Sequence, residues 1–166
     1  LRVPGDKPAI LDISFSGTST FWVDALDINS QYVTDVAFDY TGGTYEGMRP
    51  INHRWLQGYV HHLDFVVADG SWTVDVKPFC SARTMTGNSI SGAGDEVVYV
   101  NQAGEATITH TGANNFAVWS HQAFDELDLP VNVIGAFADT VDIDSGTVFL
   151  VMEATDSDGA WSVTFP

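Results

Sequence analysis

The chain has little cysteine, little positive charge and no long apolar run. Cys80 is the single cysteine among 166 residues, so no disulfide can form within the chain. Six Lys and Arg residues stand against 22 Asp and Glu residues, which gives a formal net charge of -16. Nucleic acids and anionic membranes attract positive surfaces, so neither is an expected partner. No run of 18 apolar residues occurs, so no segment is expected to span a membrane.

The short motifs of catalysis are also missing. The chain contains no G-x-S-x-G elbow, no H-E-x-x-H zinc motif, no phosphate-binding P-loop and no dinucleotide fingerprint. We therefore expect a protein that is not an enzyme. A glycoside hydrolase-like activity is the catalytic alternative left open, because two carboxylates that meet only in the fold leave no motif in the sequence.

The chain does have many apolar residues, and they alternate with other residues as they do in β-strands. Hydrophobic residues make up 45% and aromatic residues 12% of the chain, as in globular proteins. Phe21, Val23 and Ala25 share one face of a period-two pattern, and similar alternation recurs along the chain. Asp69-Gly70 and Asp158-Gly159 each separate two alternating runs, as hairpin turns do. This pattern predicts an all-β fold.

The two halves of the chain share a pattern. Ile13–Gly17 aligns with Ile108–Gly112, and Gly70 and Trp72 align with Gly159 and Trp161. Such recurrence in one order indicates an internal duplication. We expect both tryptophans to be buried equivalents that close the core of their units.

The duplication predicts two tandem β-sandwich units, of jelly-roll or immunoglobulin-like type. Each unit is too small to bury a large core alone, so we expect the two to pack together. The predicted parts are an N-terminal arm over 1–7, unit 1 over 8–78, a linker over 79–94 and unit 2 over 95–166.

The segment over 43–62 is the candidate ligand site, because it is longer than its counterpart in the second half and rich in aromatic and basic residues. Aromatic faces beside polar groups are typical of carbohydrate sites. The alternative is that Trp55 caps the end of the sandwich. The predicted ligand-binding residues are Tyr45, Glu46, Asn52, Arg54, Trp55 and Tyr59.

Metal binding has one candidate ion, calcium. Adjacent strand residues point to opposite faces, so His61 and His62 do not indicate a zinc site. Carboxylates two residues apart in glycine-containing turns are typical of hard-cation loops. Solvated acidic turns are the alternative in so acidic a chain. The predicted ligands are Asp142, Asp144, Asp156 and Asp158.

Three stretches of the second half carry a resemblance: Thr109–Trp119, Val131–Phe137 and Asp158–Val163. Together they resemble a β-sandwich repeat module of exported proteins from actinobacteria and other prokaryotes. The resemblance implies an accessory surface domain without an assigned catalytic function, and it supplies no ligand residue.

Two functions are expected. The first is a non-catalytic binding module that recognises carbohydrate or a surface protein, in adhesion for example. The second is a structural subunit of an extracellular filament or surface assembly that self-associates by β-strand addition, with the N-terminal arm as the donor. Only two lysines among abundant Asp, Gly, Ser and Thr are typical of exported β domains. A chain that begins with Leu1 has either lost a signal peptide or been shortened in another way. We expect an extracellular or cell-surface location.

Overall fold

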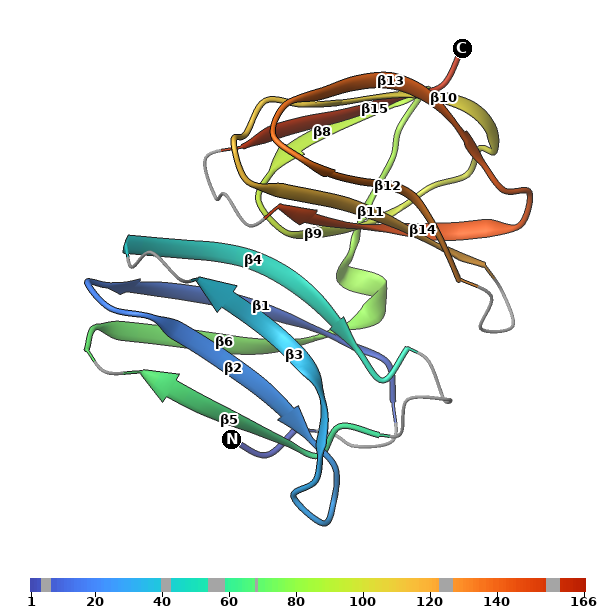
Figure 1. Ribbon diagram of the computed structural model, residues 1–166. Coiled ribbons are helices and arrows are strands. Elements are labelled where there is room, and N and C mark those ends of the chain that lie inside the picture. Colours follow the sequence, from blue (N-terminus) through green and yellow to red (C-terminus); the bar gives the residue numbers. More distant parts are fainter. Residues whose placement is uncertain (4–6, 40–42, 54–58, 68, 123–126, 155–158) are drawn as a thin grey trace. The chain divides into compact units, whose positions relative to one another are not determined.

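The computed structural model is built almost entirely of β-strands (Figure 1), which confirms the all-β prediction. It describes residues 1–3, 7–39, 43–53, 59–67, 69–122, 127–154 and 159–166. Within these ranges, the helical content is the short 3-10 turn η2 (Phe79–Ser81). No helix of the described ranges is long and apolar enough to cross a membrane.

The chain divides into two compact units, and unit 1 spans Leu1–Ser81. Its two antiparallel sheets have the strand orders β4-β1-β6 and β3-β2-β5. The strands are β1 (Ala9–Gly17), β2 (Phe21–Leu26), β3 (Tyr32–Asp39), β4 (Gly43–Ile51), β5 (His62–Val67) and β6 (Ser71–Pro78).

Unit 2 spans Ala82–Pro166 and also contains two sheets. Their orders are β13-β10-β15-β8 and β12-β11-β14-β9-β7. Its strands are β7 (Arg83–Thr84), β8 (Ser89–Ala93), β9 (Glu96–Tyr99), β10 (Gly104–His110), β11 (Asn115–Gln122), β12 (Leu127–Ile134), β13 (Phe137–Ile143), β14 (Thr147–Ala154) and β15 (Ala160–Thr164).

The predicted linker over 79–94 is wrong for most of its length. From Ala82 onward these residues belong to unit 2, where β8 pairs along its length with β15. An edge strand needs few apolar residues, because only some of the side chains on its inner face are covered by the core. Ile90 is the buried side chain of β8, and the surrounding Ser, Gly and Ala residues gave the segment the composition of a linker.

Strands β1 to β6 have the same order and pairing as β10 to β15. The sheet β4-β1-β6 corresponds to β13-β10-β15, and β3-β2-β5 corresponds to β12-β11-β14. The registers define matching positions, since Phe15 opposes Trp72 as His110 opposes Trp161. Stacked rings support this match: Phe15 lies 4.5 Å from Phe21, and His110 lies 4.2 Å from Phe116, between ring centroids.

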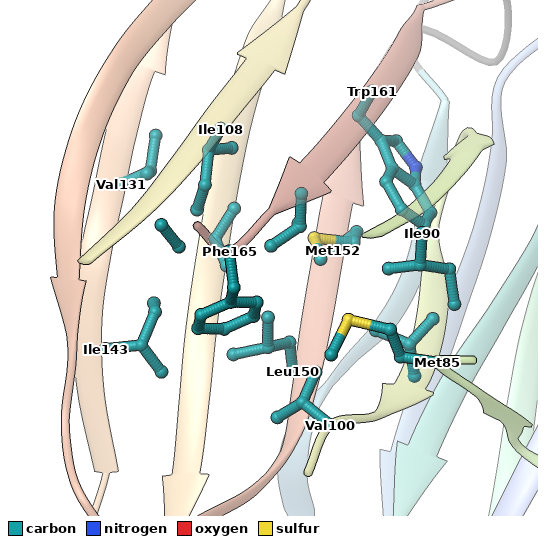
Figure 2. Packing of buried hydrophobic residues seen from close by; sticks show 14 of the residues in the cluster. Met85, Ile90, Val100, Ile108, Val131, Ile143, Leu150, Met152, Trp161 and Phe165 are labelled. Carbon is teal, nitrogen blue, oxygen red and sulfur yellow. The ribbon is translucent and has the colours of Figure 1, made fainter. Parts of the chain in front are cut away.

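Each unit buries its own hydrophobic core between side chains of both its sheets. In unit 1 the alternating residues Phe21, Val23 and Ala25 of β2 are fully buried, as the pattern predicts. In unit 2 the core includes Ile108 of β10, Leu150 of β14 and Trp161 of β15 (Figure 2). Unit 2 also buries Met85 and Ile90, which come from the segment that holds β7 and β8.

The predicted hairpin at Asp69-Gly70 is wrong, because the strands on either side of it belong to different sheets. Asp158 lies outside the described residues, but β14 and β15 also belong to different sheets, so they do not form the predicted hairpin. Strand β5 pairs with β2, whereas β6 pairs with β1. In unit 1 the Asp69 carboxylate accepts hydrogen bonds from the backbone N–H groups of Thr18 and Ser19, both at 3.0 Å. The hydrogen bonds from the Thr18 and Ser19 hydroxyls, with these two from the backbone, hold the pKa of Asp69 below its usual value. The turn therefore ties the two sheets together at one end of the unit.

Candidate functional site: the open edge of strand β6

Half of the predicted ligand segment is strand, and Tyr45 lies inside the core. Gly43–Ile51 forms β4, which pairs along its length with β1. Tyr45 is buried, and its ring centroid lies 6.1 Å from that of Phe21. The prediction that Tyr45 flanks a ligand is therefore wrong, because a core side chain offers no face to a bound molecule.

Asn52 closes the segment after β4 and is not available to a ligand. Its φ of 56° places it in the left-handed region, which asparagine tolerates better than most residues. The Val60 N–H donates to Oδ1 of Asn52 at 2.7 Å, and Nδ2 donates to the Val60 carbonyl at 3.2 Å. Since both partners are buried, this side chain acts as a structural clamp, contrary to the ligand-binding prediction.

The other predicted ligand residues are exposed or lie outside the described ranges. Glu46 and Tyr59 are exposed. Arg54 and Trp55 lie outside the described residues, so the cap and the stacking platform predicted for Trp55 stay alternatives. Carbohydrate recognition by this segment stays a prediction.

The predicted calcium ligands that the structure describes are turn and strand residues. Asp142 is exposed on β13. The Asp144 carbonyl accepts from Oγ1 of Thr147 at 2.8 Å, and Nε2 of Gln122 donates to its carboxylate at 3.2 Å. Asp156 and Asp158 lie outside the described residues. Across the described ranges, no group of three or more His, Cys, Asp or Glu is placed to hold a metal ion.

The clearest difference between the matching parts of the two units lies along β6 and β15. The inward side chains of β15 and the residue after it are closed off from solvent: Trp161 is 2%, Val163 0% and Phe165 1% exposed. Their matches on β6 are not, since Trp72 is 41% and Val76 37% exposed. We call Trp72, Val74 and Val76 the β6 stripe. The prediction that Trp72 is buried is wrong.

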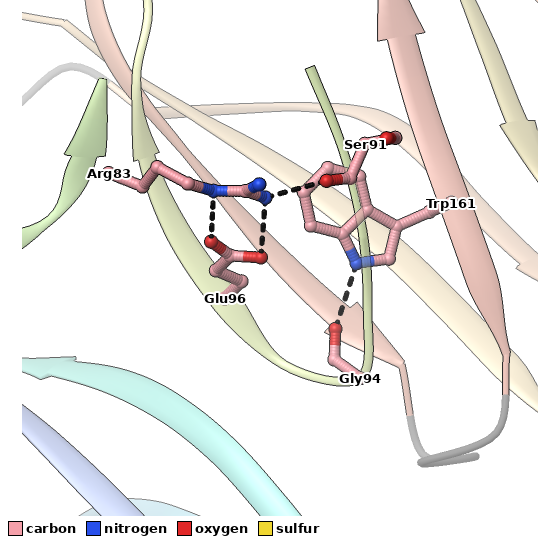
Figure 3. A network of polar contacts seen from close by, with 5 residues as sticks. All are labelled: Arg83, Ser91, Gly94, Glu96 and Trp161. Atoms are coloured by element: carbon pink, nitrogen blue, oxygen red, sulfur yellow. Dashed lines mark hydrogen bonds and ion pairs between the residues drawn. The ribbon is translucent and has the colours of Figure 1, made fainter. Parts of the chain in front are cut away.

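Strand β8 is the reason that Trp161 is buried. It forms the edge of the sheet beyond β15 and places Gly92 opposite Trp161 and Ile90 opposite Val163. A Cβ on Gly92 would lie 2.5 Å from Cζ2 of Trp161, so only glycine leaves room for the indole. Nε1 of Trp161 donates to the Gly94 carbonyl at 3.0 Å (Figure 3).

Arg83 fastens the outer side of β8 (Figure 3). Its guanidinium donates to both carboxylate oxygens of Glu96, at 2.8 and 2.9 Å, and to the Ser91 carbonyl at 2.7 Å. It also lies 5.9 Å from the centroid of the Trp161 ring. Burial raises the pKa of Glu96 above its usual value, and the bond and charge of Arg83 oppose that effect.

In unit 1, β6 is the last strand of its sheet in the described residues. Trp72 stacks on Phe65 with ring centroids 4.1 Å apart, so one face of its indole is covered. No described residue accepts a hydrogen bond from its Nε1, in contrast to Trp161. The β6 stripe therefore presents apolar side chains beside an unpaired strand edge.

The predicted N-terminal arm is not free, because its first residues pair with β5. Arg2 bridges to His62, and the Val3 N–H donates to the His61 carbonyl at 3.0 Å. Unit 2 has the same arrangement, since Tyr99 of β9 pairs with Phe149 and the Val100 N–H donates to Val148 at 3.1 Å. Leu1–Val3 thus take the place of the end of β9, and no described segment takes the place of β8.

A shallow polar pocket of ≈ 450 Å³ lies beside β8 in unit 2. Hydroxyl side chains and Arg83 form most of its wall, and none of the described residues that line it is aromatic. Its lining residues are Arg83, Thr84, Thr86, Ser89, Ile90, Ser91, Ser162 and Thr164. Sugar recognition usually uses an aromatic stacking surface, and the described lining residues offer none.

The candidate functional site is therefore the β6 stripe with its open strand edge. Period-two alternation marks Trp72, Val74 and Val76 as inward-facing, but it does not show whether a further strand covers them. Comparison with models of known protein families gave no match, and neither did comparison with the sequences of curated proteins. The resemblance to the exported repeat module therefore stays a prediction.

Proposed function

We propose that this chain is a non-catalytic structural module of an extracellular or cell-surface assembly, made of two duplicated β-sandwich units. It joins to another chain by β-strand addition at the open edge of β6. The observation that carries the proposal is the contrast between β15, which β8 covers, and β6, which no described strand covers.

An uncovered sheet edge carries backbone N–H and C=O groups that a second chain can pair with. Main-chain hydrogen bonds give such addition its affinity, and the side-chain pockets beside the edge give it specificity. The β6 stripe supplies the second element, because Trp72 and Val76 would lose exposed apolar surface when a strand is added.

Proteins usually protect their exposed edges with charged side chains, and the two units differ in this respect. In unit 2 Arg83 donates to the Ser91 carbonyl on the outer side of β8. On β6 the basic residue is Lys77, whose ammonium pairs instead with Asp12 of the neighbouring strand β1. This ion pair directs Lys77 toward β1. The other charged residue of β6 is Asp75, which is exposed and acidic, so no cation of β6 is directed to its open edge as Arg83 is to β8.

Selection from a displayed peptide library tests the proposal without assuming a partner. We expect the full chain to enrich peptides of extended, alternating pattern, and Val74→Pro to enrich none of them. The Val74 N–H matches that of Val163, which faces β8 because the Phe165 N–H two residues later donates to the Asn88 carbonyl. Proline at position 74 therefore removes a group that an added strand needs without breaking the ladder to β1. Equal enrichment on both proteins, or none on either, would contradict strand addition at β6.

A further inference from the structure

The edge that β6 presents has an occupied counterpart within the same chain. Strand β8 sits on β15 with Gly92 opposite Trp161, Ser91 opposite Ser162 and Ile90 opposite Val163. Because Trp72 and Val74 match Trp161 and Val163 in register, the seated strand shows which chemistry the open edge fits.

We infer that the partner of β6 is an extended segment of another chain that runs antiparallel to it with glycine opposite Trp72 and a branched apolar residue opposite Val74. This inference rests on the proposed function and adds to it the identity of the accepted strand. The occupant is thus a strand with the side-chain pattern of β8, apolar-x-Gly, and not an arbitrary extended peptide.

Glycine is required opposite Trp72 because there is too little space beside the indole for a side chain. In unit 2 the Cβ of any other residue at position 92 would lie 2.5 Å from Cζ2 and 3.0 Å from Cε2 of Trp161. Trp72 cannot move inward to make room, because Phe65 already stacks on it with an interplanar angle of 8°. A side chain opposite Trp72 would therefore hold the added strand away from β6.

A hydrogen bond fixes the register of the added strand. In unit 2 the Trp161 indole donates to the carbonyl of Gly94, two residues after the glycine that faces it. Trp72 has the same donor without a described acceptor. The carbonyl two residues beyond the partner glycine would accept it, so the indole N–H of Trp72 reports directly on correct seating.

The test joins a strand of this pattern to the full chain, which removes the concentration dependence of binding. The position of Leu1 in unit 1 corresponds to that of Val98 in unit 2. The Leu63 N–H donates to the Leu1 carbonyl at 2.7 Å, and Leu150, the residue of unit 2 that matches Leu63, pairs with Val98. A copy of residues 82–97 placed directly before Leu1 therefore brings a second β8 to β6. The matched control carries valine in place of the copied glycine.

Two-dimensional NMR measures the signal of the indole N–H of Trp72, which is assigned as the signal that is lost in the Trp72→Phe variant. With the glycine extension we expect this signal to move downfield and its hydrogen exchange to slow by about tenfold or more. With the valine extension we expect it to stay as in the parent chain. The Trp161 signal, unchanged throughout, shows that unit 2 remains folded.

The outcomes separate the inference from the proposed function. Protection of Trp72 by both extensions would overturn the glycine requirement but leave strand addition standing. Protection by neither would overturn the inferred strand chemistry, and the peptide selection would then decide the proposed function on its own.

Discussion

Trp161→Ala is expected to lower the free energy of unfolding of unit 2 by about 3–5 kcal/mol, the usual cost of removing a buried tryptophan. Its indole is 2% exposed, contacts the core of unit 2 and donates a hydrogen bond to Gly94. The substitution leaves a cavity under β8 and an unpaired Gly94 carbonyl. Arg83 also loses the ring that it lies over.

Trp72→Ala is the matched control, because it changes the same residue type at the matching position. This substitution mainly removes the stacking of the indole on Phe65, so a cost of about 1 kcal/mol is expected. Urea denaturation followed by circular dichroism measures both variants. Equal destabilisation by the two substitutions would show that Trp72 is as well enclosed as Trp161, and the open edge would not exist.

Gly92→Val is expected to destabilise unit 2 by about 1–3 kcal/mol, the range for overpacking at a filled site. A Cβ at this position would meet Trp161 and Oε2 of Glu96, each at 2.5 Å. The carboxylate can move, but the indole is held by the core and by Gly94. We therefore expect β8 to separate from β15 near Trp161.

Chemical denaturation and the indole N–H signal of Trp161 in two-dimensional NMR together measure this effect. Ser91→Val serves as control, since Ser91 is exposed and adjacent on the same strand. Valine favours strands, so the control is expected to keep the parent stability. A Gly92→Val protein as stable as the Ser91→Val protein would mean that the indole tolerates a side chain opposite it, and the glycine requirement inferred for β6 would lose its basis.

The strands themselves could be predicted from local pattern, because alternation reports which side chains share a face. The buried series Phe21, Val23 and Ala25 on β2 is an example. Pairing could not be predicted in the same way. Asp69-Gly70 has the composition of a hairpin turn, yet it connects two sheets, since the partner of each flanking strand lies elsewhere in the chain.

Whether each tryptophan is buried could not be predicted from local sequence either. The local sequences Asp-Gly-Ser-Trp and Asp-Gly-Ala-Trp are nearly identical, but Trp161 is enclosed and Trp72 is not. The difference comes from β8, a strand distant in sequence from Trp161 and composed of residues that also suit a linker. No property of the tryptophans themselves carries this information.

The positions of Tyr45 and Asn52 could not be predicted for a different reason. Residue type alone marks these two as candidate ligand residues, but it does not reveal whether a side chain is buried or whether its polar atoms already have partners. The clamp between Asn52 and Val60 depends on a left-handed backbone at Asn52 and on the return of the chain after position 58. Only the folded backbone brings those groups together.

Hydrogen exchange of the backbone amides on β6 and β15 tests the open edge most directly. The Phe165 N–H donates to the Asn88 carbonyl at 2.8 Å, so on β15 the amides of Trp161, Val163 and Phe165 face the β8 side. The matching amides on β6 are those of Trp72, Val74 and Val76. We predict that these three exchange close to the rate of unstructured peptide, while the three of unit 2 are protected. Equal protection of both sets in the unmodified chain would contradict an open edge on β6.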